Sequence, residues 1–271
     1  MHPDYLIFSK RGTYTFMSKN KLEKFAEMAA LPNVLEYPFG VLREGAAFPY
    51  KGRWHSEVFG NNNPIILELG CGRGEYTVGL GRLYPDKNFI GIDIKGNRMW
   101  TGATTAHREG LDNVRFLRTH IEMLTEFFAH EEVAEIWITF PDPQMKKVRK
   151  RLTSVRFLQM YKSILDTDSG VLHLKSDSPF LYTFTKALAE HNGLTIIEDI
   201  QDIHNNVPED SVLRMIRTYY ESQWVNRGLT INYLALRLDN LSEASTDPDI
   251  EIEHDSYRSY GRQRRSEINL L

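Results

Sequence analysis

The sequence contains very little cysteine and no long hydrophobic run. Its single cysteine, Cys71, excludes an intramolecular disulfide framework and argues against a cysteine zinc site, so no metal is expected. No stretch approaches the roughly 20 consecutive apolar residues that a membrane helix requires. The first 12 residues also lack the apolar segment and small-residue cleavage site of a secretory signal. We therefore expect a cytoplasmic protein without a membrane partner, and nothing in the sequence implies an obligate protein partner.

The sequence also lacks a strong net charge: the sum is −3, which does not by itself indicate nucleic-acid binding. The distribution, however, is uneven. Residues 241–255 hold six acids and no Lys or Arg. Residues 141–156 hold one acid, Asp142, against six cations: Lys146, Lys147, Arg149, Lys150, Arg151 and Arg156. Because salt screens exposed charges beyond about 10 Å, this local segment matters more for binding a polyanion than the total does.

From residue 64 onward, short apolar runs alternate with amphipathic ones. Helical spacing is found near 75–83 and 96–109 and over Arg156–Leu165 and Pro179–His191. Seven runs are predicted to be strands: Ile65–Leu69, Phe89–Ile94, Val114–Leu117, Ala134–Phe140, Val171–Lys175, Leu194–Ile200 and Leu229–Leu238. This alternation predicts an α/β fold, a doubly wound, mostly parallel, seven-stranded Rossmann-like sheet with helices on both faces.

The same pattern predicts three regions along the chain. Residues 61–240 are expected to form the sheet domain. Residues 1–60 contain one amphipathic helix, Asn20–Ala30, and then a segment interrupted by Pro and Gly, so we expect an N-terminal extension of irregular chain that packs on the core. Residues 241–271 are polar and lack periodic apolar positions, which predicts a mobile C-terminal tail.

One motif joins the first strand of the predicted sheet domain to the following helix. The strand Ile65–Leu69 contains Glu68 and continues into a loop with three alternating glycines, Gly70, Gly72 and Gly74. Glycine permits positive φ and lets a ligand approach the backbone closely. The loop lies at the carboxyl end of a strand, where open α/β sheets bind ligands. Asp93 ends the next strand, where an acid can accept hydrogen bonds from ribose hydroxyls.

Two classes of cofactor compete for this motif. A dinucleotide fingerprint has the spacing G-x-G-x-x-G, whereas the spacing here is G-x-G-x-G. Glu68 is unfavourable beside a diphosphate but suits S-adenosyl-L-methionine, which carries an amino group and a sulfonium and no phosphate. The motif therefore favours S-adenosyl-L-methionine over a nicotinamide dinucleotide. Cys71 lies inside the loop and is expected to fill space, because no His or Asn constellation supports a nucleophile there.

A second motif ends the fourth predicted strand, as Phe140-Pro141-Asp142-Pro143-Gln144 followed by MKKVRKR. Proline on both sides of Asp142 stiffens the turn and holds the carboxylate at the carboxyl edge of the sheet, beside the predicted cofactor. The cations that follow can neutralise several phosphates. The candidates for contact with an RNA backbone are Lys147, Arg149, Lys150 and Arg151. A solvated helix face is the alternative for such a charge run.

The chain resembles the bacterial tRNA (guanine-N7-)-methyltransferases, a family of class I S-adenosylmethionine-dependent enzymes, from about residue 20 to residue 240. The resemblance rests, in order, on NKLEKFAEMAALPNV, ELGCGRGE, FIGIDI, TFPDPQMKKVRKRLTS, LKSDS and RTYYE. Glycine loops are shared by many methyltransferases, whereas Phe-Pro-Asp-Pro with the basic run and the later T-x-Y-E are far more specific. The resemblance implies a methyltransferase sheet, S-adenosyl-L-methionine as cofactor and guanine 46 of the tRNA variable loop as target.

It also implies roles for individual residues. Glu68 and Asp93 match cofactor-binding acids, and Asp142 matches the residue regarded as catalytic, which we also expect to contact the cofactor. The positions assigned to the target nucleotide are matched by Lys146, Asp177, Thr218, Tyr219, Tyr220 and Glu221.

The chain departs from the family pattern at four positions. Gln144 stands where Trp is common, Val148 where a His is common, and Ser176 where Thr is usual. Thr119 takes the place of a cofactor-binding Asp, and its hydroxyl is expected to bind the adenine amine more weakly than a carboxylate does. These changes bear on the adenine and tRNA contacts and leave the reaction unchanged. Two other functions remain open: methylation of another substrate, and RNA binding without catalysis.

Overall fold

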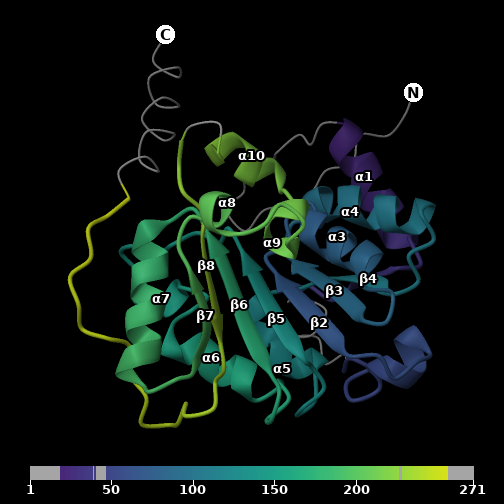
Figure 1. Cartoon of the computed structure of the whole chain (residues 1–271). Helices are drawn as coiled ribbons and strands as arrows, with labels where there is room; N and C mark the ends of the chain where they lie inside the picture. The colour runs from purple at the N-terminus through teal and green to yellow at the C-terminus, as the bar shows by residue number, and fades with distance from the viewer. Residues whose placement is uncertain (1–18, 39, 41–46, 226–227, 256–271) are drawn as a thin grey trace, which may run out of the picture.

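The computed structural model describes residues 19–38, 40, 47–225 and 228–255. One mixed sheet of eight strands, in the order β1-β4-β3-β2-β5-β6-β8-β7, lies between two layers of helices (Figure 1). The strands are β1 (Val34–Glu36), β2 (Ile65–Leu69), β3 (Asn88–Asp93), β4 (Val114–Arg118), β5 (Glu135–Thr139), β6 (Val171–Ser176), β7 (Ile196–Ile200) and β8 (Asn232–Leu236). All neighbours are parallel except β8, which runs antiparallel to β6 and β7. The doubly wound, mostly parallel fold is confirmed.

The sheet has one strand more than the seven predicted. The additional strand, β1, pairs in parallel with β4, from Val34 opposite Phe116 to Glu36 opposite Arg118. It belongs to the segment that the sequence predicted to be irregular. Three residues are too few to display the alternation that identifies a strand, so tertiary pairing decides this element.

The helices are α1 (Lys19–Ala30), α3 (Glu75–Leu83), α4 (Gly96–Arg108), α5 (Leu124–Phe127), α6 (Val155–Lys162), α7 (Pro179–His191), α8 (Ile203–Asn206), α9 (Val212–Met215) and α10 (Tyr219–Val225). Three short turns of other helix types are η1 (Trp54–Phe59), η2 (Ile121–Met123) and η3 (Val148–Lys150). Among the helices of the described residues, none is long and apolar enough to cross a membrane.

The alternation of side chains along β2 divides the core into two halves. Ile65, Leu67 and Leu69 join the cluster that packs under α5, α6 and α7. Ile66 joins the cluster on the opposite face, formed with α1, α3 and α4. Glu68 shares the second face because successive strand residues point to opposite sides. This register brings a carboxylate under α3, directly behind the glycine loop.

Residues 241–255 lie against the domain in the described structure, and the expectation of a mobile tail did not anticipate their contacts. Leu241 is buried in the core cluster, and the Lys162 ammonium donates to the Leu241 carbonyl at 2.7 Å. Asn192 Nδ2 donates to the Thr246 carbonyl at 3.0 Å. The rest of the expected tail, residues 256–271, lies outside the described residues.

Candidate active site

The loops that follow β2, β5 and β6 and the segment before α10 meet at the carboxyl edge of the sheet around a cavity of about 390 Å³. Seven of the residues predicted for the site line it: Glu68, Gly70, Gly72, Asp142, Asp177, Thr218 and Tyr220. They come from positions up to 152 residues apart in the chain, 68 to 220. The structure therefore joins the two sequence motifs and the later Thr-Tyr-Tyr-Glu segment in one place.

The glycine loop turns sharply between β2 and α3. Gly70, Gly72 and Gly74 have φ of 73°, 56° and 71°, a region that L side chains rarely adopt. The Gly70 and Cys71 amides donate to the Ile92 carbonyl at 2.8 and 3.0 Å. A Cβ on Gly74 would lie 2.5 Å from the Phe116 ring, so Gly74 serves helix packing. Gly70 and Gly72 leave the backbone open toward the cavity.

Glu68 is the buried acid of the cavity, with 3% of its surface exposed. Its carboxylate accepts from the Thr77 amide at 2.8 Å, from the Thr77 hydroxyl and from the Thr139 hydroxyl at 2.8 Å. Burial outweighs these hydrogen bonds and raises the pKa of Glu68 to about 7. A cationic ligand group beside this carboxylate would favour its ionised form.

Asp93, at the end of β3, fixes the glycine loop from the neighbouring strand. Its carboxylate accepts from the Gly72 amide at 3.0 Å and from the Lys95 amide at 2.9 Å. A carboxylate oxygen accepts more than one hydrogen bond, so these contacts are compatible with the predicted ribose contact.

Thr119, predicted to bind the cofactor, and Cys71, predicted to fill space in the glycine loop, are both buried. Thr119 follows β4, is 1% exposed, and its hydroxyl has no hydrogen-bond partner among the described residues. Its predicted contact with the adenine amine stays a prediction. Burial raises the pKa of the Cys71 thiol well above its ordinary value, so the thiol stays protonated, which agrees with a space-filling role.

The loop after β5 holds Asp142 in a strained turn. Phe140 and Gln144 have φ of 50° and 47°, in the left-handed region, and such residues concentrate at functional sites. Asp142 is exposed, and its Oδ1 accepts from the Gln144 amide at 3.1 Å. The carboxylate thus stands at the mouth of the cavity with most of its hydrogen-bonding capacity directed to solvent.

The basic segment that follows divides into two kinds of residue. Lys146, Lys147, Arg149 and Lys150 are exposed. Arg151 is only 4% exposed, and its guanidinium donates to the Met145 carbonyl at 2.7 Å and lies over the rings of Phe180 and Phe184. This position corrects the prediction that Arg151 contacts RNA, because a guanidinium folded into the loop cannot reach a phosphate.

Predicted substrate-binding residues occupy the other wall. Thr218 and Asp177 are buried at the cavity wall, whereas Tyr219 and Tyr220 are exposed by 47% and 38%. The Tyr219 amide donates to Glu75 Oε1 at 3.1 Å, and the Arg73 guanidinium lies 4.4 Å from the centre of the Tyr219 ring. The first residue of α10 is therefore attached to the start of α3, directly after the glycine loop.

Glu221 has a different position from the one predicted. It is fully buried and forms an ion pair at 2.8 Å with the Lys175 ammonium, and its other oxygen lies 3.1 Å from His204 Nε2. Lys175 also donates to the Leu213 carbonyl at 2.7 Å. Both carboxylate oxygens are engaged inside the protein, so Glu221 anchors α10 instead of facing a substrate. The sequence signal for this pair was a lysine within the apolar strand Val171–Ser176.

Comparison with known proteins places this arrangement in a family. A model described as a putative methyltransferase matches residues 62–234. The tRNA (guanine-N(7)-)-methyltransferase of Porphyromonas gingivalis is 58% identical over 241 residues, covering 89% of this chain and 98% of the relative. The enzyme of the same name from Bacteroides fragilis is 56% identical over 250 residues, covering 92% and 98%. The chain belongs to the tRNA (guanine-N7-)-methyltransferase family.

Solved structures with this fold extend beyond the family. An antibiotic-related methyltransferase superposes with a TM-score of 0.51 at 15% identity, covering 67% of this chain and 90% of its own. The 16S rRNA methyltransferase KamB gives 0.53 at 12% identity, covering 68% and 92%. At such low identity these matches confirm the Rossmann-like methyltransferase fold alone.

Proposed function

We propose that this chain transfers a methyl group from S-adenosyl-L-methionine to N7 of guanine 46 in the variable loop of tRNA. The observation that carries the proposal is one cavity in which the Glu68 pocket, the exposed Asp142 carboxylate and the segment before α10 meet, with exposed cations directly after Asp142. Membership of the tRNA (guanine-N7-)-methyltransferase family identifies guanine as the target base and N7 as the methylated atom.

The residues of the cavity fit the cofactor. Gly70 and Gly72 lack the Cβ atoms that would narrow the cavity beside the loop, and Glu68 offers a buried carboxylate to a cationic amino acid moiety. The Asp93 carboxylate, which holds the Gly72 amide, would accept from ribose hydroxyls, and the Thr119 hydroxyl, unpartnered among the described residues, would accept from the adenine amine. The bound cofactor would supply an electrophilic methyl group on a sulfonium.

Guanine N7 carries a lone pair and no proton, so the nucleophile needs no general base. The protein's task is to align N7 with the methyl group and to stabilise the positive charge that forms on the ring. Asp142 and Asp177 line the cavity and carry the right charge. Ionised carboxylates also accept from guanine N1–H and from the amine on guanine C2, whereas adenine has no donor at these two positions. We therefore assign Asp142 to guanine orientation and charge stabilisation.

The Glu68 pKa of about 7 leads to a prediction about pH. A bound ammonium favours ionised Glu68, so cofactor binding releases the proton that Glu68 holds at low pH. Affinity should rise roughly tenfold between pH 6 and pH 8, because the competent ionised fraction rises through that pKa. Isothermal titration across this range should show the rise in the wild type and a flat profile in Glu68→Gln. A steep profile in Glu68→Gln would assign the proton to another group.

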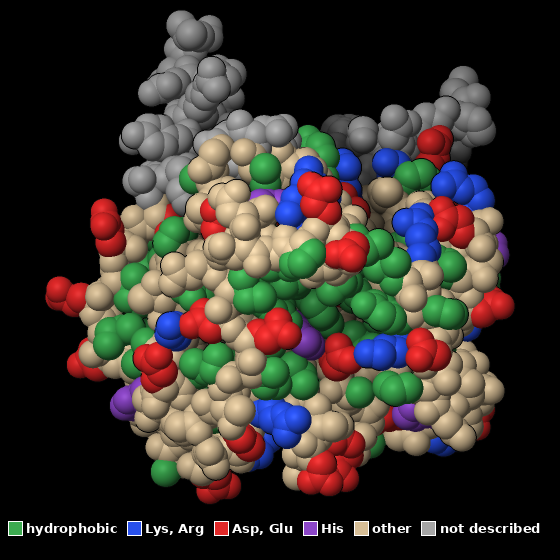
Figure 2. Space-filling view, in the orientation of Figure 1, with side chains coloured by type: hydrophobic (Ala, Val, Ile, Leu, Met, Phe, Trp, Pro, Cys, Tyr) green, Lys and Arg blue, Asp and Glu red, His purple; other side chains and the backbone are tan. Residues whose placement is uncertain are grey.

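Tight binding of tRNA should depend on the exposed cations of residues 146–150. On the face shown in Figure 2, Lys and Arg side chains are mixed with Asp and Glu instead of forming one broad basic surface. Residues 146–150 concentrate four exposed cations next to Asp142, where they can neutralise several phosphates. The triple variant Lys147→Ala, Arg149→Ala, Lys150→Ala should weaken tRNA binding and lower the slope of log K against log salt by about 2 to 3.

Filter binding over a range of salt concentrations measures that slope. Arg108→Ala, an exposed cation at the end of α4, is the control and should leave the slope unchanged. An unchanged slope in the triple variant would show that residues 147–150 do not contact the RNA backbone.

The proposal is tested with transcripts of one tRNA that differ only at position 46. The wild-type protein with labelled cofactor should methylate the transcript that has guanine 46 and leave the adenine 46 transcript unlabelled. Equal labelling of both would contradict the assignment of the target.

A further inference from the structure

Residues 247–255, which we call the C-terminal strap, run beside α7 toward the carboxyl edge of the sheet (Figure 1). The strap carries five of the six acids of residues 241–255, and two of them differ from the others. Asp247 is half-buried and Asp255 is buried with 8% exposure, whereas Asp249, Glu251 and Glu253 are exposed. The burial of two carboxylates in a polar segment indicates that they have a specific structural task.

The two strap carboxylates bind the amino ends of two helices. Asp247 Oδ1 accepts from the amide of Val155, the first residue of α6, at 2.8 Å. Ser154, at the N-cap position of α6, makes no side-chain cap, and its hydroxyl has no partner among the described residues. Asp247 therefore supplies the carboxylate that the local sequence does not, and an anion is favoured at the positive end of a helix.

Asp255 does the same for α7. Its Oδ1 accepts from the Phe180 amide at 3.1 Å, and its Oδ2 accepts from the Ser178 hydroxyl. Ser178 is the N-cap residue of α7 and itself accepts from the Leu181 amide at 3.0 Å. Ser178 directly follows Asp177, which lines the cavity, so Asp255 holds the strand end that presents Asp177.

Asp247 and Asp255 also contact the region of the loop between β5 and α6, residues 140–154, which carries Asp142 and the basic residues. Asp247 binds Val155, directly after the loop, and the Asp255 amide donates to Met145 Sδ at 3.3 Å. Between them Arg151 is held 4.7 and 4.3 Å from the ring centres of Phe180 and Phe184 while it donates to the Met145 carbonyl. The strap thus contacts the loop at Met145 and the helix residue directly after the loop, and α7 contacts Arg151 between these two points.

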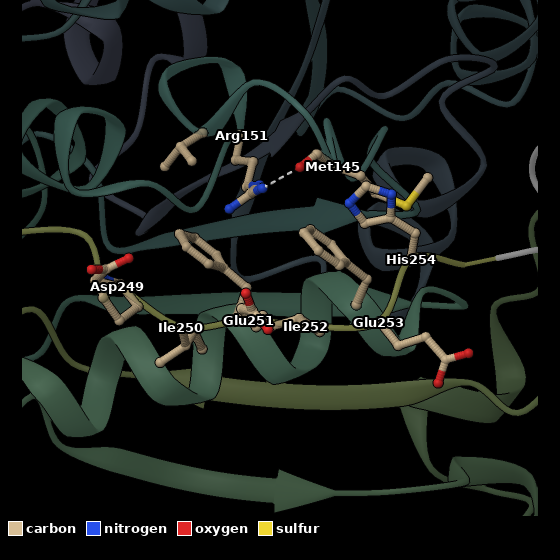
Figure 3. Close-up of a pocket in the computed structure, with 12 residues that line it drawn as sticks. Met145, Arg151, Asp249, Ile250, Glu251, Ile252, Glu253 and His254 are labelled. Atoms are coloured by element: carbon tan, nitrogen blue, oxygen red, sulfur yellow. Dashed lines mark hydrogen bonds between the residues drawn. The ribbon is translucent and has the colours of Figure 1, made fainter.

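The close-up in Figure 3 shows this arrangement around a cavity of about 680 Å³. Strap residues Asp249 to Glu253 lie along one side, Arg151 and Met145 lie on the other, and the His254 ring lies beside Met145. The His254 ring meets the Phe180 ring edge-on at 5.6 Å. Between these contacts an open cavity separates the loop from the strap. The end of the loop is also held by α7, since the Thr185 hydroxyl donates to the Thr153 hydroxyl at 2.8 Å.

We propose that the C-terminal strap is a clip that positions the Asp142 loop, with Asp247 and Asp255 as its positioning residues. The role of that loop in methyl transfer rests on the proposed function. The positioning itself rests only on the contacts above. Loss of the clip should loosen residues 142–154 and slow methyl transfer. The cofactor pocket around Glu68 should stay intact, because it is built from β2, α3, β3 and the end of β5, which the strap carboxylates do not contact.

The test compares two double variants of the full chain. Asp247→Ala with Asp255→Ala removes the clip, and Asp249→Ala with Glu251→Ala removes the same charge from exposed positions of the same strap. Hydrogen exchange read by mass spectrometry should show faster exchange over residues 142–154 in the first variant only, with β2 and β3 unchanged. The first variant should lose about tenfold in kcat on tRNA, because reacting groups must be closely aligned, and should keep its cofactor affinity.

Unchanged exchange over residues 142–154 in the clip variant would overturn the proposal. Cofactor affinity that fell in step with kcat would overturn it too, since the strap would then support the whole fold. If the double variant does not fold, the single variant Asp247→Ala is measured against Asp249→Ala with the same readouts. If the two double variants differ in exchange as expected but the wild-type protein methylates no tRNA, the result counts against the proposed function alone.

Discussion

Replacing Asp142 with alanine should lower kcat about 100-fold, the usual effect of removing one group that stabilises charge in a transition state. Cofactor affinity should change little, because the carboxylate is exposed at the mouth of the cavity and its one described hydrogen bond is to the Gln144 amide. Single-turnover methylation of tRNA, with titration calorimetry of the cofactor, measures the two effects separately.

Asp142→Asn is the matched control for the geometry of the loop. The amide oxygen still accepts from the Gln144 amide, so the turn is retained while the negative charge is lost. A similar loss of kcat in Asn and Ala would assign the effect to charge. Full activity in Asn would show that the carboxylate only shapes the turn, and an equal loss of cofactor binding in Ala would contradict the assignment of Asp142 to the reaction.

Replacing Lys175 with methionine should cost about 3–5 kcal/mol of folding free energy, because it leaves the Glu221 carboxylate buried without its cation. Neither side chain of this ion pair is exposed to solvent, and burial lowers the pKa of Lys175 to about 8 even beside that carboxylate. Urea unfolding measures the loss. Lys186→Met breaks a pair with Asp199 that is partly exposed, and it should cost less than about 1 kcal/mol.

The double variant Lys175→Met with Glu221→Leu separates stability from positioning. Removing both charges should restore most of the folding free energy, since a buried pair gains little over well-packed apolar groups. Methyl transfer should nevertheless be slow in the double variant, as in Lys175→Met, because the ion pair no longer holds Thr218 and Tyr220 against the cavity. An active double variant would mean that this ion pair has no part in the site.

The elements that the sequence predicted well are those with a local signal. The glycine loop, the strands β2 to β8 and the Pro-Asp-Pro turn each show their pattern within about ten residues, and each is found where expected. Glu68 was identified because an acid in the strand before the glycine loop suits a cationic cofactor better than a diphosphate. The chemistry of the cofactor pocket could thus be inferred before its geometry was known.

The misplaced residues have contacts that come from distant parts of the chain. From the sequence, Arg151 could not be distinguished from its exposed basic neighbours. In the structure its guanidinium packs on the Phe180 and Phe184 rings of α7. Glu221 was assigned to the target nucleotide, whereas Lys175 of β6 pairs with it inside the protein. Asp247 and Asp255 lie in a segment without periodicity, and only the amino ends of α6 and α7 give them partners. Composition and spacing describe a residue's neighbours in sequence, whereas burial of a charge depends on its neighbours in space.

Mass spectrometry of the reacted tRNA distinguishes methylation at N7 of guanine 46 from methylation anywhere else. Unmodified tRNA is incubated with the protein and S-adenosyl-L-methionine, digested with a base-specific nuclease, and the fragments are sequenced by their masses. We expect a single added methyl group on the variable-loop fragment, present as 7-methylguanosine at position 46. A methyl group on another base or another atom of guanine, or unmodified tRNA from a protein that binds the cofactor, would contradict it.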